Sequence, residues 1–354
     1  MNWQKILAAN QNVCDKRSQR SSKAKGCLNM NYRPTVKTLQ FLAIQKLEVM
    51  RRLIRRPAAQ EAVVILDLED ALWDVTDPTR TAKLKADGRK ELLAFVQKFP
   101  WSFSQRRIGI RLNRIASDEF KLDVEALAQI TGRVQIDTIV VTKVESAGEL
   151  ADSILQFAAN HVRYNHLVPI IETKSGISNL DGIMDEARKN KVEDVVYGHY
   201  DYSLDSEQWP FLACDETAYW EHLIPIVRQI EDKGLNTIHS PLFEIYDDAR
   251  FSEYYYRICT VCRRGFGVLT LGEQQTSLCL DLAGKKSVKA CCPLRDTRVS
   301  TREELIQSAK TTIRSFEEYR RANVSFVLDT RSGCFISPHV YLAAVRYLEK
   351  EQNG

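Results

Sequence analysis

Short runs of aliphatic and β-branched residues alternate with longer amphipathic stretches along most of this 354-residue chain. Eight runs have the character of buried strands: residues 39–43, 63–66, 108–110, 138–141, 167–171, 194–197, 235–238 and 267–271. The stretches between them have helical periodicity; residues 146–162, for example, place Leu150, Ile154 and Phe157 on one face. Parallel strands need helical crossovers, and closing the sheet removes its exposed edges. The pattern therefore predicts an α/β fold, a (β/α)8 barrel.

The alternative α/β fold is a doubly wound open sheet with a glycine-rich phosphate loop after an early strand. The chain contains no GxGxxG or GxxxxGK[ST] motif, so the barrel is preferred. We divide the chain into a basic arm (1–35), the barrel (36–295) and a C-terminal helical extension (296–354). Within the extension, the sequence predicts a long amphipathic helix, a short strand, a loop and a final helix.

The net charge of +4 is unevenly distributed, because the arm alone carries +6 from seven basic residues and Asp15. The arm offers few aromatic residues for stacking on bases, which argues against a nucleic-acid partner. The sequence has no secretory signal and no apolar run long enough to cross a membrane, so we expect a cytoplasmic protein without a membrane partner.

The nine cysteines are irregularly spaced, which is not typical of a disulfide framework. Cys259 and Cys262 form a CxxC pair, with Cys291 and Cys292 about thirty residues further on. Because the second pair is adjacent, zinc ligation is disfavoured, and buried thiols at the end of a helix are the preferred interpretation.

Polar and charged residues follow almost every predicted strand. In chain order they are Asp67, Glu69 and Asp70, then Arg111 and Asn113, Lys143 and Glu145, Glu172, Asp201, and His239. The carboxyl ends of all strands in a barrel meet at one face, where barrel enzymes build their active sites. We therefore expect these side chains to converge.

Several carboxylates with a single strand-end histidine favour a hard cation, Mg²⁺ or Mn²⁺, over zinc. Glu172 and Asp201 are the predicted metal ligands. Arg111 has a planar guanidinium suited to a substrate carboxylate. A cation and an arginine together would bind a 2-oxo acid and stabilise its enolate, the species formed when a neighbouring carbon–carbon bond is made or broken.

Five motifs make the sequence resemble the citrate lyase beta subunit family, which includes malyl-CoA lyase and related aldolases of the HpcH/HpaI aldolase superfamily. In order they are VVILDLEDAL, GIRLN, VVTKVES, IIETKSG and YGHYDYSLD. The resemblance covers residue 36 to the C-terminus, and it implies a TIM barrel of the phosphoenolpyruvate-binding type, a magnesium ion and a homotrimer or hexamer. Matched by motif, Glu172 and Asp201 fall on the metal ligands and Arg111 on the substrate-carboxylate arginine. Asp67, Glu69 and Asp70 fall on the acidic cluster around the metal's waters.

The chain departs from the family pattern in three places. The first strand lacks the Arg-Ser and Phe-x-Pro elements of members that cleave CoA thioesters, which argues against CoA. The end of the eighth strand keeps only Gln275 of its usual motif. The C-terminal aspartate that serves as general acid or base is replaced in CFISP by Ile336 or Ser337, and an isoleucine cannot transfer a proton.

His239 and His199 are the candidates to replace that proton-transfer group. We assign catalytic roles to Arg111, Glu69 and His239, and substrate binding to Arg111, Asn113, Lys143 and Gln275. Lys143 is disfavoured as a Schiff-base lysine, because acidic neighbours keep it protonated.

The preferred function is a Mg²⁺-dependent carbon–carbon lyase or aldolase that acts on a small 2-oxo acid or acyl compound. Malyl-CoA and citryl-CoA are not its expected substrates. The alternative is a barrel that binds such a compound without turnover, as a sensor or scaffold subunit.

Overall fold

A computed structural model describes residues 36–44, 47–56, 59, 61–285, 291–297, 299–320, 325–329 and 331–353. The predicted basic arm, 1–35, lies outside them. The described chain forms a closed barrel of eight parallel strands in the order β1 to β8, so the predicted (β/α)8 fold is confirmed. The strands are β1 (Val36–Ala43), β2 (Val63–Asp67), β3 (Ile108–Arg111), β4 (Ile136–Val141), β5 (Tyr164–Ile171), β6 (Asp194–Tyr197), β7 (Asn236–His239) and β8 (Phe266–Thr270).

Helices connect successive strands and continue into the C-terminal segment. Those of the barrel region are α2 (Leu47–Ile54), the 3-10 helix η1 (Asp70–Leu72), α4 (Pro78–Lys98), α5 (Trp101–Gln105), α6 (Asp118–Thr131), α7 (Ala147–Ala159), α8 (Lys174–Ser178), α9 (Leu180–Lys189), α10 (His199–Asp205), α11 (Thr217–Asp232), α12 (Asp248–Val261) and α13 (Glu273–Gly284). In the described part of the chain, no helix has the length and apolar character needed to span a bilayer.

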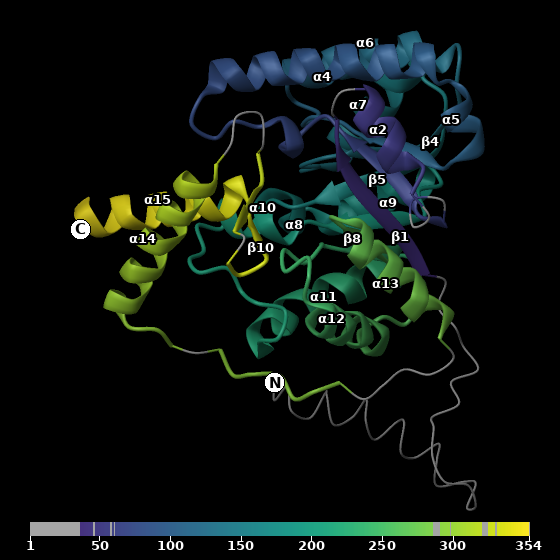
Figure 1. The fold of residues 1–354 in the computed structure, drawn as a ribbon. Helices are drawn as coiled ribbons and strands as arrows, with labels where there is room; N and C mark the ends of the chain where they lie inside the picture. Colours follow the sequence, from purple (N-terminus) through teal and green to yellow (C-terminus); the bar gives the residue numbers. More distant parts are fainter. Residues whose placement is uncertain are drawn as a thin grey trace, which may run out of the picture. The chain divides into compact units, whose positions relative to one another are not determined.

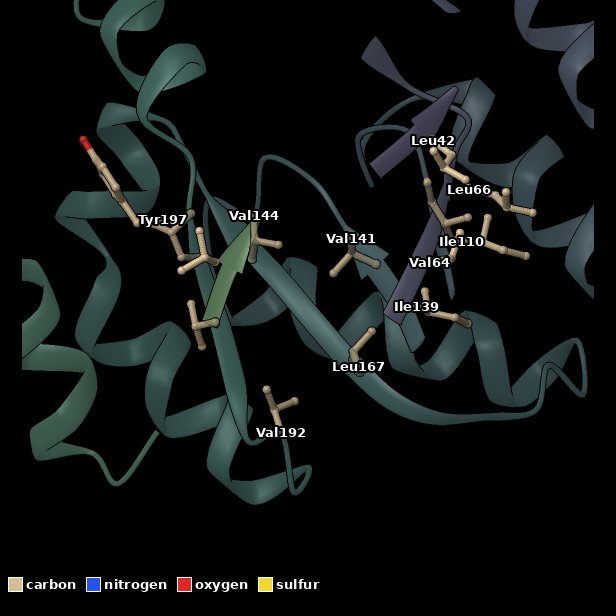
Figure 2. Close-up of a cluster of buried hydrophobic side chains, with 14 of the residues drawn as sticks. Leu42, Val64, Leu66, Ile110, Ile139, Val141, Val144, Leu167, Val192 and Tyr197 are labelled. Carbon is tan, nitrogen blue, oxygen red and sulfur yellow. The ribbon is translucent and has the colours of Figure 1, made fainter. Parts of the chain in front are cut away.

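Side chains alternate along each strand between two apolar cores, as the pleat requires. In β2, Val63 and Ile65 belong to the core inside the barrel. Val64 and Leu66 belong to the larger core between strands and helices, which Figure 2 shows in close-up. Each aliphatic side chain fully buried in this way stabilises the fold by about 1.5–3 kcal/mol. Because both faces of β2 and of the second half of β5 are buried, these segments read as continuous apolar runs in the sequence.

Hydroxyl caps start several helices directly after the strand-end residues. Thr173, which follows Glu172, accepts a hydrogen bond from the backbone N–H of Gly176 and starts α8. Ser146 caps α7 in the same way through Glu149. After β4 and β5 these caps start the next helix within a few residues of the strand, so the intervening polar residues stay at the carboxyl end of the barrel.

The C-terminal segment contains α14 (Arg302–Tyr319), β9 (Val327–Asp329), β10 (Cys334–Ile336) and α15 (Pro338–Asn353). The predicted long helix, short strand and final helix are confirmed. The predicted loop also contains β10, which pairs antiparallel with β9. Helix α14 packs against α15 (Figure 1), and α15 packs against α10 of the barrel. The backbone N–H of Phe335 in β10 donates to the carbonyl of Phe243, 2.8 Å away, so this hairpin contacts the loop after β7.

Candidate functional site

A pocket of about 460 Å³, including its open mouth, lies where the strand ends meet the C-terminal segment. One part of its lining is apolar and aromatic: Phe41, Tyr200, Phe243, Leu269, Leu271 and Phe326. The other part is charged or ionisable: Asp70, Arg111, Glu172, Asp201 and His339. Four of these five residues follow or end strands in the way that the sequence predicts; His339 comes from α15.

Arg111, the last residue of β3, is surrounded by three carboxylates. Its Nε and Nη2 donate to the two carboxylate oxygens of Asp67, and Nη1 donates to Asp70 Oδ2 at 2.9 Å. Nη1 also lies 3.1 Å from Glu69 Oε2. The ring of Phe41 from β1 lies 4.8 Å from the guanidinium carbon, on the fourth side. The guanidinium thus lines the pocket while its donors are directed at protein carboxylates.

Lys143 follows β4 with a positive φ of 53°, a left-handed conformation that costs a non-glycine residue about 1–2 kcal/mol. This turn directs both its nitrogens to the acidic group. The backbone N–H donates to Glu172 Oε1 at 3.0 Å, and the ammonium pairs with Glu69 and with Asp201 Oδ1, the latter at 2.9 Å. Burial opposes the charge, yet Asp201 and Glu69 raise the pKa of Lys143 well above its usual value. Lys143 is therefore held protonated, and its exclusion as a Schiff-base lysine stays a prediction.

Glu172 follows β5 and is almost completely buried. Burial, together with the charge of Asp201, raises the pKa of Glu172 well above its usual value. Its side chain fits only because residue 198 on the neighbouring strand end is glycine: a Cβ there would lie 2.4 Å from Glu172 Oε2. The backbone of Gly198 has φ −96°, which any residue adopts, so the glycine is required for space and not for conformation.

We therefore expect Gly198→Ala to displace Glu172 and to weaken Mg²⁺ binding tenfold or more, by about 1.4 kcal/mol or more, without removing any predicted ligand. Isothermal titration calorimetry with Mg²⁺ measures this effect. Gly182→Ala, at a position where an added Cβ meets nothing within 4 Å, is the control and should leave the affinity unchanged. Equal affinities in the two variants would contradict the placement of Glu172.

His339, in the first turn of α15, is the pocket residue that the sequence interpretation missed. Its Nε2 lies 3.1 Å from Asp201 Oδ2 and 3.6 Å from Asp70 Oδ1. Burial opposes protonation, but Asp201 and Asp70 raise the pKa of His339 above its usual value. The available signal was its position, two residues after Ser337 in the segment that lacks the family's C-terminal acid.

The carboxylates of the site outnumber its cationic side chains. Five carboxylates (Asp67, Glu69, Asp70, Glu172 and Asp201) are in contact with or close to Arg111, Lys143 and His339. Even with His339 protonated, two negative charges are in excess. Accordingly, burial and the charge of Asp70 raise the pKa of Glu69 to about 7. An excess of two buried carboxylates, all of them oxygen donors, fits a divalent cation such as Mg²⁺.

Three of the other predicted site residues lie outside the pocket. His239 ends β7 with its side chain toward the helices, where Nε2 lies 3.4 Å from Cys262 Sγ. Asn113 donates to the carbonyl of Leu68 and to Asp123. The side-chain amide of Gln275 donates to the carbonyl of Leu242, 2.9 Å away. Their polar groups bind other protein groups, so their catalytic or substrate-binding roles stay predictions.

His199 lines the pocket, but its ring is held by the structure: Nε2 lies 2.9 Å from the carbonyl of Leu212. Burial lowers the pKa of His199 to about 4. Its ring edge also faces Tyr219, with centroids 4.9 Å apart. These contacts are those of a neutral structural histidine.

Burial also lowers the pKa of His239 to about 3, from an ordinary value of 6.5. Below pH 6.5 the unfolded chain therefore takes up a proton at His239 that the folded chain does not. The free energy of unfolding consequently decreases as the pH is lowered from 6.5 to 3. We expect His239 to account for about 2 kcal/mol of the loss of unfolding free energy between pH 8 and pH 5. Urea denaturation at pH 8 and pH 5 measures this effect. The free energy of unfolding of His239→Gln should differ between the two pH values by about 2 kcal/mol less than that of wild type. The exposed His166→Gln is the control, and equal behaviour of the two variants would contradict the prediction.

Residues 40–209 match the family model described as HpcH/HpaI aldolase/citrate lyase. No curated protein matches the chain.

Solved structures share the fold at low sequence identity. RipC from Yersinia pestis has TM-score 0.50 and 19% identity, covering 71% of this chain and 95% of its own. The citrate lyase beta subunit of Mycobacterium tuberculosis, complexed with oxaloacetate and magnesium, has TM-score 0.51 and 18% identity and covers 72% and 100%. CitE from the same organism, in complex with magnesium, acetoacetate and coenzyme A, has TM-score 0.51 and 16% identity and covers 90% and 99%.

Proposed function

Because the chain belongs to the HpcH/HpaI aldolase/citrate lyase family, as a divergent member, we propose that it is a Mg²⁺-dependent carbon–carbon lyase or aldolase. Its substrate would be a small 2-oxo acid or acyl compound that reacts through an enolate. The observation that carries this proposal is the excess of two buried carboxylates beside a pocket that Arg111 also lines. Similar structures that hold magnesium with oxaloacetate or acetoacetate support it.

Glu172 and Asp201 would hold the ion, with Asp67, Glu69 and Asp70 close enough to bind its waters. When bound, Mg²⁺ supplies Lewis-acid stabilisation of the negative charge that develops on an enolate oxygen. It also supplies the positive charge that the buried carboxylates lack.

The chain's own residues position the acid and exclude water. Two hydrogen bonds to Asp67 fix the orientation of the Arg111 guanidinium, and its positive charge at the pocket lining would attract a substrate carboxylate. The stacked rings of Tyr200 and Phe243, with centroids 3.7 Å apart, form an apolar wall that Phe326 of the C-terminal segment extends. A drier pocket strengthens each of these charge interactions.

A non-catalytic binding barrel is the second candidate. The observation that favours it is the absence of an acid where family lyases carry the C-terminal aspartate. Ile336 lies in β10, and the Ser337 hydroxyl accepts a hydrogen bond from the backbone N–H of Val340.

Solvent exchange distinguishes the two candidates without knowledge of the natural substrate. An enolate-forming enzyme removes a proton from carbon 3 of pyruvate or 2-oxobutanoate and returns a deuteron from D₂O, which NMR detects. We expect exchange that needs both protein and Mg²⁺ and stops when EDTA is added. Binding of the acids by calorimetry without any protein-dependent exchange would support the binding barrel instead.

Malyl-CoA, citramalyl-CoA and citryl-CoA are expected to be poor substrates, because neither Ile336 nor Ser337 can replace a carboxylate whose proton transfer typically contributes about 10²–10⁴ in rate. Purified protein with Mg²⁺ should cleave each of them well below about 1 s⁻¹, the low end of ordinary enzymes. We expect Ile336→Asp to restore little thioester cleavage, because Ile336 lies in β10 and does not line the pocket. Turnover of any of the three thioesters near that rate would refute the exclusion.

A further inference from the structure

Asp70, Asp201 and His339 come from three distant parts of the chain and meet at one point. Asp70 starts η1 after β2, Asp201 lies in α10 after β6, and His339 lies in α15. One oxygen of each carboxylate and one ring nitrogen of the histidine all lie within 4.8 Å of one another. This spacing allows a single ion to contact all three atoms.

In each of the two carboxylates, one oxygen contacts a cationic side chain and the other faces His339. Asp70 Oδ2 accepts a hydrogen bond from Arg111, and Asp201 Oδ1 pairs with the ammonium of Lys143. The second oxygen of each, Oδ1 of Asp70 and Oδ2 of Asp201, faces Nε2 of His339.

The imidazole of His339 supplies the independent observation. The residue is 2% exposed and lines the pocket, yet neither ring nitrogen makes a hydrogen bond of good geometry with any described residue. Trp73 holds the ring edge-on, with centroids 5.3 Å apart. A buried imidazole whose Nε2 contacts one oxygen of each of two carboxylates, and whose Nδ1 has no hydrogen-bond partner among the described residues, has the surroundings of a metal ligand.

We propose that Asp70, Asp201 and His339 bind a divalent first-row transition metal through one nitrogen and two oxygens. This inference rests on the proposed function, because it concerns the same acidic site, and it specifies the ion. Imidazole suits transition ions such as iron, nickel and zinc, whereas Mg²⁺ prefers oxygen ligands. The single nitrogen donor therefore favours a transition ion such as Mn²⁺ over Mg²⁺, and three protein ligands leave positions for water or a substrate acid.

His339 also makes the ion a link between the barrel and the C-terminal segment. Asp70 and Asp201 belong to the barrel, whereas His339 starts the helix that ends the described chain. Ion binding should therefore order the junction between β10 and α15 in addition to neutralising the carboxylates.

The test uses the full-length protein, freed of metal by a chelator and then loaded with Mn²⁺ alone. Electron spin echo envelope modulation detects a nitrogen coordinated directly to Mn²⁺, and labelling histidine with ¹⁵N changes the modulation. We expect the nitrogen signal in wild type and its loss in His339→Gln, together with at least a tenfold weaker Mn²⁺ affinity. His222→Gln, which changes a histidine stacked on Tyr202 outside the pocket lining, is the control and should keep the signal.

Three outcomes separate this inference from the proposed function. If wild type binds Mn²⁺ without nitrogen coupling, the inference is overturned. If Glu172 and Asp201 alone hold the cation, the proposed function still stands. Failure of wild type to bind either Mn²⁺ or Mg²⁺ overturns both. The wild-type spectrum decides the question even where His339→Gln does not fold.

Discussion

Glu172→Gln and Asp201→Asn are each expected to lower Mg²⁺ affinity by more than the roughly 10–100-fold loss that is typical of outer-shell changes at metal sites. Each variant replaces a charged oxygen ligand by a neutral amide. Protein-dependent deuterium exchange into 2-oxo acids should disappear with the ion. Calorimetric titration with Mg²⁺ and the NMR exchange assay measure the two effects.

For Glu172→Gln we also expect a gain, in the stability of the metal-free protein. Because the pKa of Glu172 is raised well above its usual value, its ionised form destabilises the metal-free protein near neutral pH. A neutral glutamine should therefore make the metal-free protein more stable to urea while removing the stabilisation by Mg²⁺. Glu145→Gln, which changes a partly exposed carboxylate paired with Arg114 at 2.7 Å, is the control. Wild-type Mg²⁺ affinity in both site variants would refute the ligand assignment.

Arg111→Met should destabilise the metal-free protein by about 3–5 kcal/mol, because it leaves the buried carboxylates of Asp67, Glu69 and Asp70 without their common partner. Arg111→Lys keeps the positive charge but loses the planar guanidinium, which can donate two parallel hydrogen bonds to one carboxylate. We expect this variant to bind 2-oxo acids in the presence of Mg²⁺ more weakly, by roughly 1.5–3 kcal/mol. Urea denaturation measures the first effect and calorimetry the second.

Arg114→Met is the matched control for stability. Its guanidinium pairs with Glu145, but the side chain is 43% exposed, so its loss should cost no more than about 1 kcal/mol. Similar losses in Arg111→Met and Arg114→Met would show that the acidic group around Arg111 is solvated. An unchanged dissociation constant for every acid in Arg111→Lys would exclude Arg111 as the substrate anchor.

Most of the barrel, and the site residues that follow its strands, can be predicted from local patterns in the sequence. Most strands contain a short apolar run that a polar residue follows, and after β5 the cap Thr173 starts the next helix. Closure of the sheet then brings Arg111, Glu172 and Asp201 to one pocket. The strand ends could be read from the sequence because apolar burial on both faces stops abruptly at them.

Side-chain direction was harder to predict, because it reverses with every residue of a strand. His239 and Ser240 are neighbours at the end of β7. His239 points to the helices, and Ser240 lines the pocket and accepts from the backbone N–H of His199. A shift of one residue in the pairing register of β7 would exchange the directions of the two side chains. The catalytic role predicted for His239 rested on its position at the end of a strand, and it stays a prediction.

The sequence by itself determined the eight strands, the acidic residues at their ends and the excess of carboxylates over cations, because each depends on local pattern or on composition. Only the tertiary structure decided which charges meet. It directs Arg111 to Asp67, Lys143 to Asp201, and His339 to the same Asp201 from a helix 138 residues further along the chain. Such partners are selected by packing between distant segments, since a buried charge is stable only beside the opposite charge that the fold brings to it.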